Sequence, residues 1–224
     1  MRSKRIQLIN RALYMAKRET TKDKILNAAE ALFAEHGFEQ TSLRQITADA
    51  EVNLASVNYH FGSKKALIQA VMARYLEVLM PALNAQFDQL EPQAQFTTRD
   101  VFDCFRQPLN ELKHVRKGGP TVFLSLLGFA YADIQGHLRR YTMEHFGEVM
   151  HRLLALLHVA NPKLSPADMF WRLHFVLGAT VFAQVSGPAL REIAAADFGE
   201  TLAADQVVDR LIPFLAGGVD APTA

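Results

Sequence analysis

The chain has 224 residues, half of them hydrophobic and about a fifth charged, which excludes an intrinsically disordered protein and allows one or two domains with a sizeable core. Its net charge of +1 conceals an asymmetry, because residues 1–65 hold eleven Lys and Arg against seven Asp and Glu, and the remainder holds thirteen against sixteen. This concentration of basic charge in the N-terminal part favours a partner that carries phosphate groups.

Residues 1–21 form a basic leading segment. Six Lys and Arg stand among the first nineteen residues, with Glu19 as the single acid. One interpretation is an N-terminal arm that touches the DNA backbone or minor groove. The other is a misassigned start, with translation beginning at Met15. Both interpretations stay open from the sequence.

Two short helices are predicted after a first helix at about Lys22–His36, which ends at Gly37. Either Thr41 or Ser42 can cap the second helix, since both hydroxyls can accept a backbone N–H two or three residues on. The apolar side of that helix has i, i+3, i+7 spacing and consists of Leu43, Ile46 and Ala50.

After a turn at residues 51–53, a third helix repeats the pattern, with an inward side of Leu54, Val57 and Phe61. Small or hydrogen-bonding residues remain on its outward side, and these suit close approach to base edges and phosphates. Gly62 is predicted to end this helix in a left-handed conformation, and Ser63 to cap the next. Lys64 and Lys65 then add charge to a helix N-terminus that already attracts anions.

Residues 22–76 contain three motifs: A-A-x-x-L-F-A-x-x-G-F at residues 28–38, T-S-L-R at 41–44 and Y-H-F-x-S-K-x-x-L at 59–67. With these motifs the segment resembles the DNA-binding domain of the TetR family of transcriptional repressors. The resemblance implies an all-α protein with a three-helix helix-turn-helix domain at 22–66 and a helical effector-binding and dimerisation domain at 67–224. The sequence of residues 53–71 further resembles the PsrA-like branch, whose members respond to long-chain fatty acids.

The DNA-contacting residues follow from the outward positions and from this resemblance. They are Thr41, Ser42, Arg44, Ala55, Ser56, Asn58, Tyr59, His60, Lys64 and Lys65. Taken singly, Tyr59 and Phe61 are as typical of core aromatics, and the two lysines of a solvated helix start. Their order and spacing together favour double-stranded operator DNA as the partner.

The remainder shows helical periodicity and no alternating strand pattern. A helix is predicted from Lys64 to about Gln89, with Pro81 inside it expected to bend or end it, and another at about Thr98–Val115. After a break with Pro120 as a first helical residue, the remaining helices are predicted at about 121–136, 137–159, 165–186 and 205–215.

The helix opened by Ser165 is apolar nearly all round from Met169 to Ala183, so every side of it must be covered. One side can face the domain interior and the other a partner subunit. The TetR resemblance implies a homodimer through the last two long helices. Such a dimer reads a palindromic operator whose half-sites lie one helical turn apart, roughly 34–36 Å.

An apolar surplus in the later helices predicts a small apolar effector. The residues predicted to line its pocket, each also typical of plain core packing, are Phe102, Phe105, Arg106, Phe123, Leu127, Phe146, His174 and Phe175. Arg106, Arg172 or His174 can bind an acidic head group. The resemblance implies relief of repression by a long-chain fatty acid or acyl-CoA; the alternative is a repressor of efflux or metabolite genes that senses another small molecule.

Enzymatic motifs are missing from the sequence: there is no G-x-S-x-G turn, no glycine-rich phosphate loop and no H-E-x-x-H. His151 and His158 share a helix face but have no carboxylate or cysteine beside them, so neither a metal nor a cofactor is predicted. A single cysteine, Cys104, fits a reducing, cytoplasmic setting. We find no signal-peptide pattern and no continuous apolar run as long as a membrane span.

Overall fold

The computed structural model describes residues 19–132 and 136–222, and all regular secondary structure in these ranges is helical. This confirms the predicted all-α class. The basic arm, or alternative start at Met15, lies outside the described residues.

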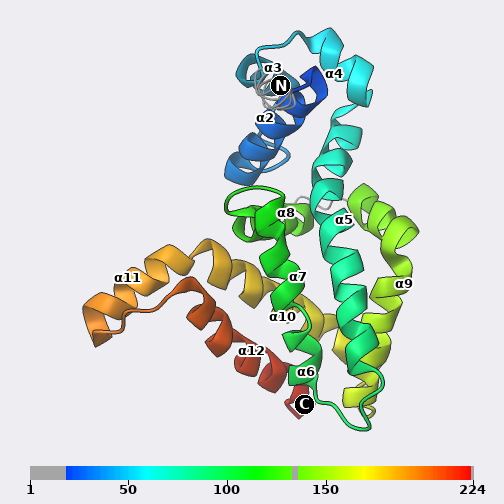
Figure 1. Ribbon diagram of the computed structural model, residues 1–224, viewed down its shortest axis with the longest axis vertical. Helices are drawn as coiled ribbons and strands as arrows, with labels where there is room; N and C mark the ends of the chain where they lie inside the picture. Colours follow the sequence, from blue (N-terminus) through cyan, green and yellow to red (C-terminus); the bar gives the residue numbers. More distant parts are fainter. Residues whose placement is uncertain (1–18, 133–135, 223–224) are drawn as a thin grey trace, which may run out of the picture.

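The reading domain consists of α2 (Thr21–His36), α3 (Leu43–Asp49) and α4 (Leu54–Phe61) and lies at the top of Figure 1. Each helix contributes apolar side chains to a common core, and the loop after α2 adds another. The fully buried members are Ile25, Ala29, Phe33, Phe38, Ile46 and Val57. The predicted apolar sides of the three helices are therefore buried against one another, which leaves the opposite side of α4 free.

Gly37 ends α2, as predicted. Its amide donates to the Phe33 carbonyl at 2.9 Å, and its backbone has φ +83° and ψ 168°, a region that is essentially restricted to glycine. A Cβ at this position would lie 2.9 Å from Cδ1 of Phe129, a residue of α8 (Gly119–Ala132). Glycine is thus required both by the backbone conformation and by the approach of α8.

Gly37→Ala is expected to lower the free energy of unfolding by about 1–3 kcal/mol, since the strained conformation and the contact with Phe129 both oppose a methyl group. Urea denaturation measures the change. Gly136→Ala is the matched control, because a Cβ at Gly136 meets no atom within 4 Å. Equal stability of the two variants would contradict the assigned role of Gly37.

The central helix α5 (Lys64–Leu90) starts beneath α4 and runs down the length of the molecule (Figure 1). It continues past Pro81, contrary to one of the predicted alternatives, and the exposed Pro81 lies on its solvent side. By length and composition α5 could cross a membrane, although the sequence has no continuous apolar run of that length. Half of its most apolar stretch is buried, however, and it packs against α2, α7 and α9 as a core helix.

The single helix predicted at 98–115 is instead three pieces: α6 (Thr98–Asp103), α7 (Arg106–Glu111) and a 3-10 turn at Leu112–His114. Pro108 explains the break, because it has no N–H for the Cys104 carbonyl and its ring crowds that carbonyl. The apolar periodicity runs through the break, so periodicity alone predicted one helix.

The remaining helices are α8, α9 (Gly136–Ala160), α10 (Pro166–Val185), α11 (Gly187–Phe198) and α12 (Ala204–Asp220). Ser165 caps α10 as predicted. Gly187 and Pro188 end α10 but also begin α11, which was not predicted, at a bend of 70°. The last helix extends beyond its predicted end at residue 215 and passes through Pro213.

Two apolar clusters make up the core. The first joins the reading domain to the upper half of α5 and to α8, and the second joins the lower half of α5 to α6, α9, α10 and α12. Val149 and Met150 of α9 are half-buried and pack against both clusters. The central helices therefore connect the reading domain to the rest of the molecule.

Candidate nucleic-acid interface

The start of α3 is fixed by a reciprocal cap. Ser42 Oγ accepts the Gln45 amide at 3.2 Å, and Gln45 Oε1 accepts the Ser42 amide at 2.7 Å. Thr41, the other predicted cap, is fully buried and donates its hydroxyl to the Gly37 carbonyl at 2.8 Å. Thr41 therefore belongs to the core of the reading domain, which corrects its assignment as a DNA contact. Arg44 is exposed in the first turn of α3.

A tight turn connects α3 to α4. Glu51 in this turn has φ +52°, and Asn53 caps α4. Asn53 Oδ1 accepts both the amide of Ser56, at 2.8 Å, and its hydroxyl, at 3.0 Å. The donor of Ser56 is therefore already used in the cap, and only its lone pairs remain for a partner.

The outward side of α4 presents Ala55, Asn58 and Tyr59, all exposed, while Val57 on the opposite side is fully buried and anchors the helix. Tyr59 is 86% exposed, and its ring meets that of the half-buried His60 edge-on at 5.0 Å. An aromatic this open has no packing role in the described fold. Its phenol is free to donate to a phosphate or a base edge.

Leu54 is 43% exposed, although the sequence placed it in the buried stripe. As the first residue of α4 it covers the exposed preceding turn, because helical side chains point toward the helix N-terminus. The sequence pattern therefore missed an apolar residue near the reading surface, one suited to contact with a thymine methyl group.

The start of α5 lies next to α4. Gly62 ends α4 with φ +74° and ψ −38°, so its φ is positive but the predicted left-handed helical conformation is not adopted. Ser63 Oγ accepts the Ala66 amide at 3.1 Å, so the predicted cap is confirmed. Lys65 is exposed and Lys64 half-buried at this N-terminus. Figure 1 shows α3, α4 and the start of α5 at one end of the molecule, away from the C-terminus. The predicted DNA residues other than Thr41 are thereby gathered at this end.

The residues predicted to line an effector pocket do not converge in one place. Phe102 and Phe105 belong to the second cluster, whereas Phe123, Leu127 and Phe146 belong to the first. Phe123 stacks on the buried Tyr75 at 5.6 Å and is a core residue. Phe175 is 68% exposed on the outer side of α10, so it does not line an interior site as predicted.

The predicted head-group donors are engaged within the fold. Arg106 donates to Asp103 and Asp209, each at 2.5 Å, and these contacts raise its pKa. Arg172 donates to backbone carbonyls at the C-terminal end of α12, those of Val219 and Ala221. His174 Nδ1 lies 2.6 Å from the Phe170 carbonyl. None of the three is a free donor poised over an empty pocket.

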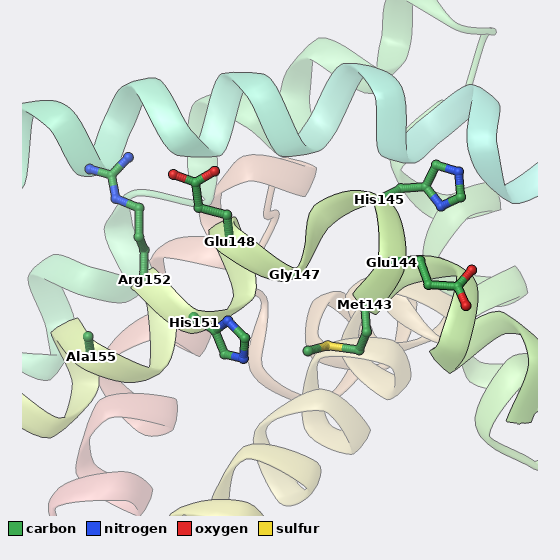
Figure 2. Close-up of a pocket in the computed structure, with 8 residues that line it drawn as sticks. All are labelled: Met143, Glu144, His145, Gly147, Glu148, His151, Arg152 and Ala155. Carbon is green, nitrogen blue, oxygen red and sulfur yellow. The ribbon is translucent and has the colours of Figure 1, made fainter.

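A hollow of about 670 Å³ lies beside α9, near a kink where Phe146 departs from helical geometry, and Figure 2 shows the residues that line it. The side chains that line it extend from two sides of the helix: Met143 and His151 lie on one side, and Glu148 and Arg152 on the side toward α5. Because it is open and carries carboxylates, this hollow does not suit an acyl chain. Among the described residues no group of three His, Cys, Asp or Glu could hold a metal ion.

The outer side of α10 carries an apolar stripe at helical spacing, formed by Trp171, Phe175, Phe182 and Val185. On α12, which packs against α10, Phe214 is 70% exposed. We call these five residues the α10–α12 face. Its large exposed aromatics are typical of a surface that pairs with another protein.

Family models match both parts of the chain. Residues 25–71 match the model described as "Bacterial regulatory proteins, tetR family", and residues 103–218, more than half of the chain, match the "Tetracyclin repressor-like, C-terminal domain". The chain belongs to the TetR family. The first match covers most of the reading domain and the second covers most of the helices that follow α5.

Curated transcriptional regulators match stretches of 54 to 86 residues of this chain. The probable transcriptional regulator YttP of Bacillus subtilis is 33% identical over 75 residues, 34% of this chain and 36% of that protein. UidR of Escherichia coli K12 is 39% identical over 54 residues, 24% and 28%. The biofilm-operon negative regulator IcaR of Staphylococcus aureus is 33% identical over 86 residues, 37% and 46%. The matches thus span less than half of each relative.

Solved structures share the TetR fold over nearly the whole chain. A mutant of HlyIIR with residues 170–185 replaced by alanine has a TM-score of 0.56 and 22% identity, and the match covers 90% of this chain and 99% of that one. The fatty acid degradation regulator FadR of Bacillus halodurans has a TM-score of 0.58 and 12% identity, with 90% and 97% covered. At these identities the likeness concerns the fold alone.

Proposed function

We propose that this TetR-family regulator is a repressor that binds a palindromic operator as a homodimer and releases it when an apolar effector binds. The observation that carries the DNA-binding part is the outward side of α4, where Tyr59 stands open beside Asn58 and above the buried Val57. The capped, lysine-bearing start of α5 lies next to it and suits phosphate. A protein of this kind acts in the cytoplasm, on chromosomal DNA.

The α10–α12 face supports the homodimer. Two copies joined there by a two-fold axis would each cover the other's exposed aromatics, and the same patch would serve both subunits. Such pairing presents two reading domains to one side of the DNA, as a palindromic operator requires.

The effector site that we propose is centred on Val149 and Met150 of α9, which are half-buried and pack against both core clusters. Further half-buried apolar side chains extend it, Leu127 and Phe146 from the first cluster and Leu173 and Val176 from the second; we call these six residues the seam. A long acyl chain inserted there gains about 0.8 kcal/mol per buried methylene. The PsrA-like sequence of residues 53–71 supports a long-chain fatty acid or acyl-CoA as the effector.

An operator titration tests the proposal. A duplex selected from a random pool is bound by the purified protein, and oleate or oleoyl-CoA is then added. We expect a 5- to 150-fold loss of operator affinity, the usual range of allosteric coupling. Met150→Trp fills the seam and is expected to bind the operator normally but to lose the response. Binding of either lipid without any change in operator affinity would refute the lipid part. A response to an aromatic or cationic compound instead would favour the alternative repressor.

A further inference from the structure

A buried carboxylate connects the reading domain to the loop before α8. Glu30 of α2 is 2% exposed, and each of its oxygens meets a different arginine. Oε2 lies 3.4 Å from Nη1 of Arg74, and Oε1 accepts a hydrogen bond from Nη1 of Arg116. Arg74 comes from α5 and also donates to Asn27 Oδ1 at 2.7 Å, whereas Arg116 comes from the loop that precedes α8.

The placement of this charge is costly for stability. Glu30 lies on the buried side of α2, between Leu26 and Phe33 at helical spacing, where an apolar side chain would pack without losing hydration. Burial and the neighbouring Glu30 carboxylate raise the pKa of Tyr75, so its phenol stays neutral beside the cluster. A buried ion pair adds little net stability, but a guanidinium fixes its partner in direction as well as distance. This cluster therefore fixes the direction and distance between its partners more than it adds to stability.

The two arginines connect different parts of the molecule. Arg74 joins α2 to α5, which are already held together by the apolar residues of the first cluster. Arg116 joins α2 to a loop outside the reading domain. That loop is tightly folded, because a Cβ at Gly119 would lie 1.9 Å from the Leu112 carbonyl oxygen. Arg116 is thus presented from a loop with little room to move.

Helix α8 makes a second contact with the reading domain at its other end, where the Phe129 ring approaches Gly37. Another side of α8 packs against α10, and a Cβ at Gly128 would lie 3.0 Å from Cγ1 of Val181. Figure 1 shows α8 between the reading domain and α10. The orientation of the reading domain is therefore tied, through α8, to the helix that carries the α10–α12 face.

We propose that Glu30 and Arg116 are positioning residues for operator binding. Their ion pair fixes the orientation of the reading domain relative to α8. The distance between the two reading domains in the dimer is then set by the positions of α8 and α10. The operator-spacing consequence rests on the proposed dimer, whereas the fixed orientation within one chain does not. Arg74 shares the same carboxylate but has no part in this role.

The test compares two variants that remove one arginine each and leave Glu30 paired with the other. Spin labels are placed at the exposed Ala31→Cys in α2 and Ala155→Cys in α9, in a Cys104→Ser background. Labelled chains are diluted with unlabelled protein, so the electron–electron distance is measured within one chain whether or not the protein is dimeric. We expect Arg116→Met to shift or broaden the distance distribution, and Arg74→Met to retain that of the unsubstituted, labelled protein.

Equal distributions for both variants, whether both broadened or both unchanged, would overturn the proposal. Arg116→Gln repeats the test with a polar side chain if the methionine variant does not fold. As a second measurement, the operator is rebuilt with its half-sites one base pair closer or farther apart. We expect loss of the preference for natural spacing in the Arg116 variant only. Failure to dimerise or bind the operator would refute the proposed function, yet the distances within one chain would still decide the positioning role.

Discussion

Tyr59→Ala is expected to weaken operator binding by at least about 100-fold, while the free energy of unfolding stays within about 0.5 kcal/mol of the unsubstituted protein. Tyr59 is 86% exposed, so its removal leaves no cavity and no unpaired buried group. A hydrogen bond from its phenol to a charged phosphate contributes about 1.5–3 kcal/mol, and a dimer makes that contact twice. Fluorescence anisotropy with the selected operator and urea denaturation measure the two quantities.

Tyr59→Phe separates the hydroxyl from the ring. If the phenol donates to a phosphate, this variant loses most of the affinity that the alanine variant loses. Val159→Ala is the control, because Val159 is also exposed and apolar but lies at the end of α9. Undiminished operator affinity in Tyr59→Ala would mean that the outward side of α4 does not read DNA.

Helix starts were predictable because their determinants are local. Ser63 and Ser165 each accept an amide three residues on, so a capping side chain and the following few residues decide the start. The same holds for Ser42, but the choice between it and Thr41 was not local. Thr41 is fixed by carbonyls of the preceding loop and helix, and its burial depends on how α2 packs against α3.

Two errors came from treating one signal as decisive. The apolar spacing between Val101 and Leu112 continues across the break caused by Pro108, and periodicity cannot reveal a missing backbone hydrogen bond. The helix predicted at 165–186 ends just before Gly187 and Pro188, yet proline in the first turn also suits a new helix, and α11 begins there. Each local signal had two structural outcomes, and tertiary packing selected between them.

The role of Glu30 was harder to predict from the sequence. Its partner Arg116 is 86 residues away, so no local window contains both charges. One signal was present, because Glu30 falls on the buried side of α2 with Leu26 and Phe33. An acid within an apolar stripe predicts either a surface position or a buried partner, and only the fold identifies which.

Phe182→Glu is expected to raise the dissociation constant of the dimer by at least about 100-fold, because each of two apolar side chains loses about 1.5–3 kcal/mol of burial. Phe182 is 60% exposed in the single chain and belongs to the α10–α12 face. A two-fold contact brings both copies of the substitution into one interface, where two carboxylates also lose hydration. Sedimentation equilibrium measures the change.

The fold of each chain should remain intact, since the side chain already faces outward; the helical signal in circular dichroism checks this. Leu154→Glu supplies the control, because Leu154 is also a partly exposed apolar residue but belongs to α9. Operator affinity should fall together with dimerisation in Phe182→Glu and stay normal in the control, because one reading domain alone contacts only one half-site. If the Phe182→Glu protein remained dimeric, the subunit contact would lie elsewhere. The dimer would then no longer explain why these aromatics are exposed.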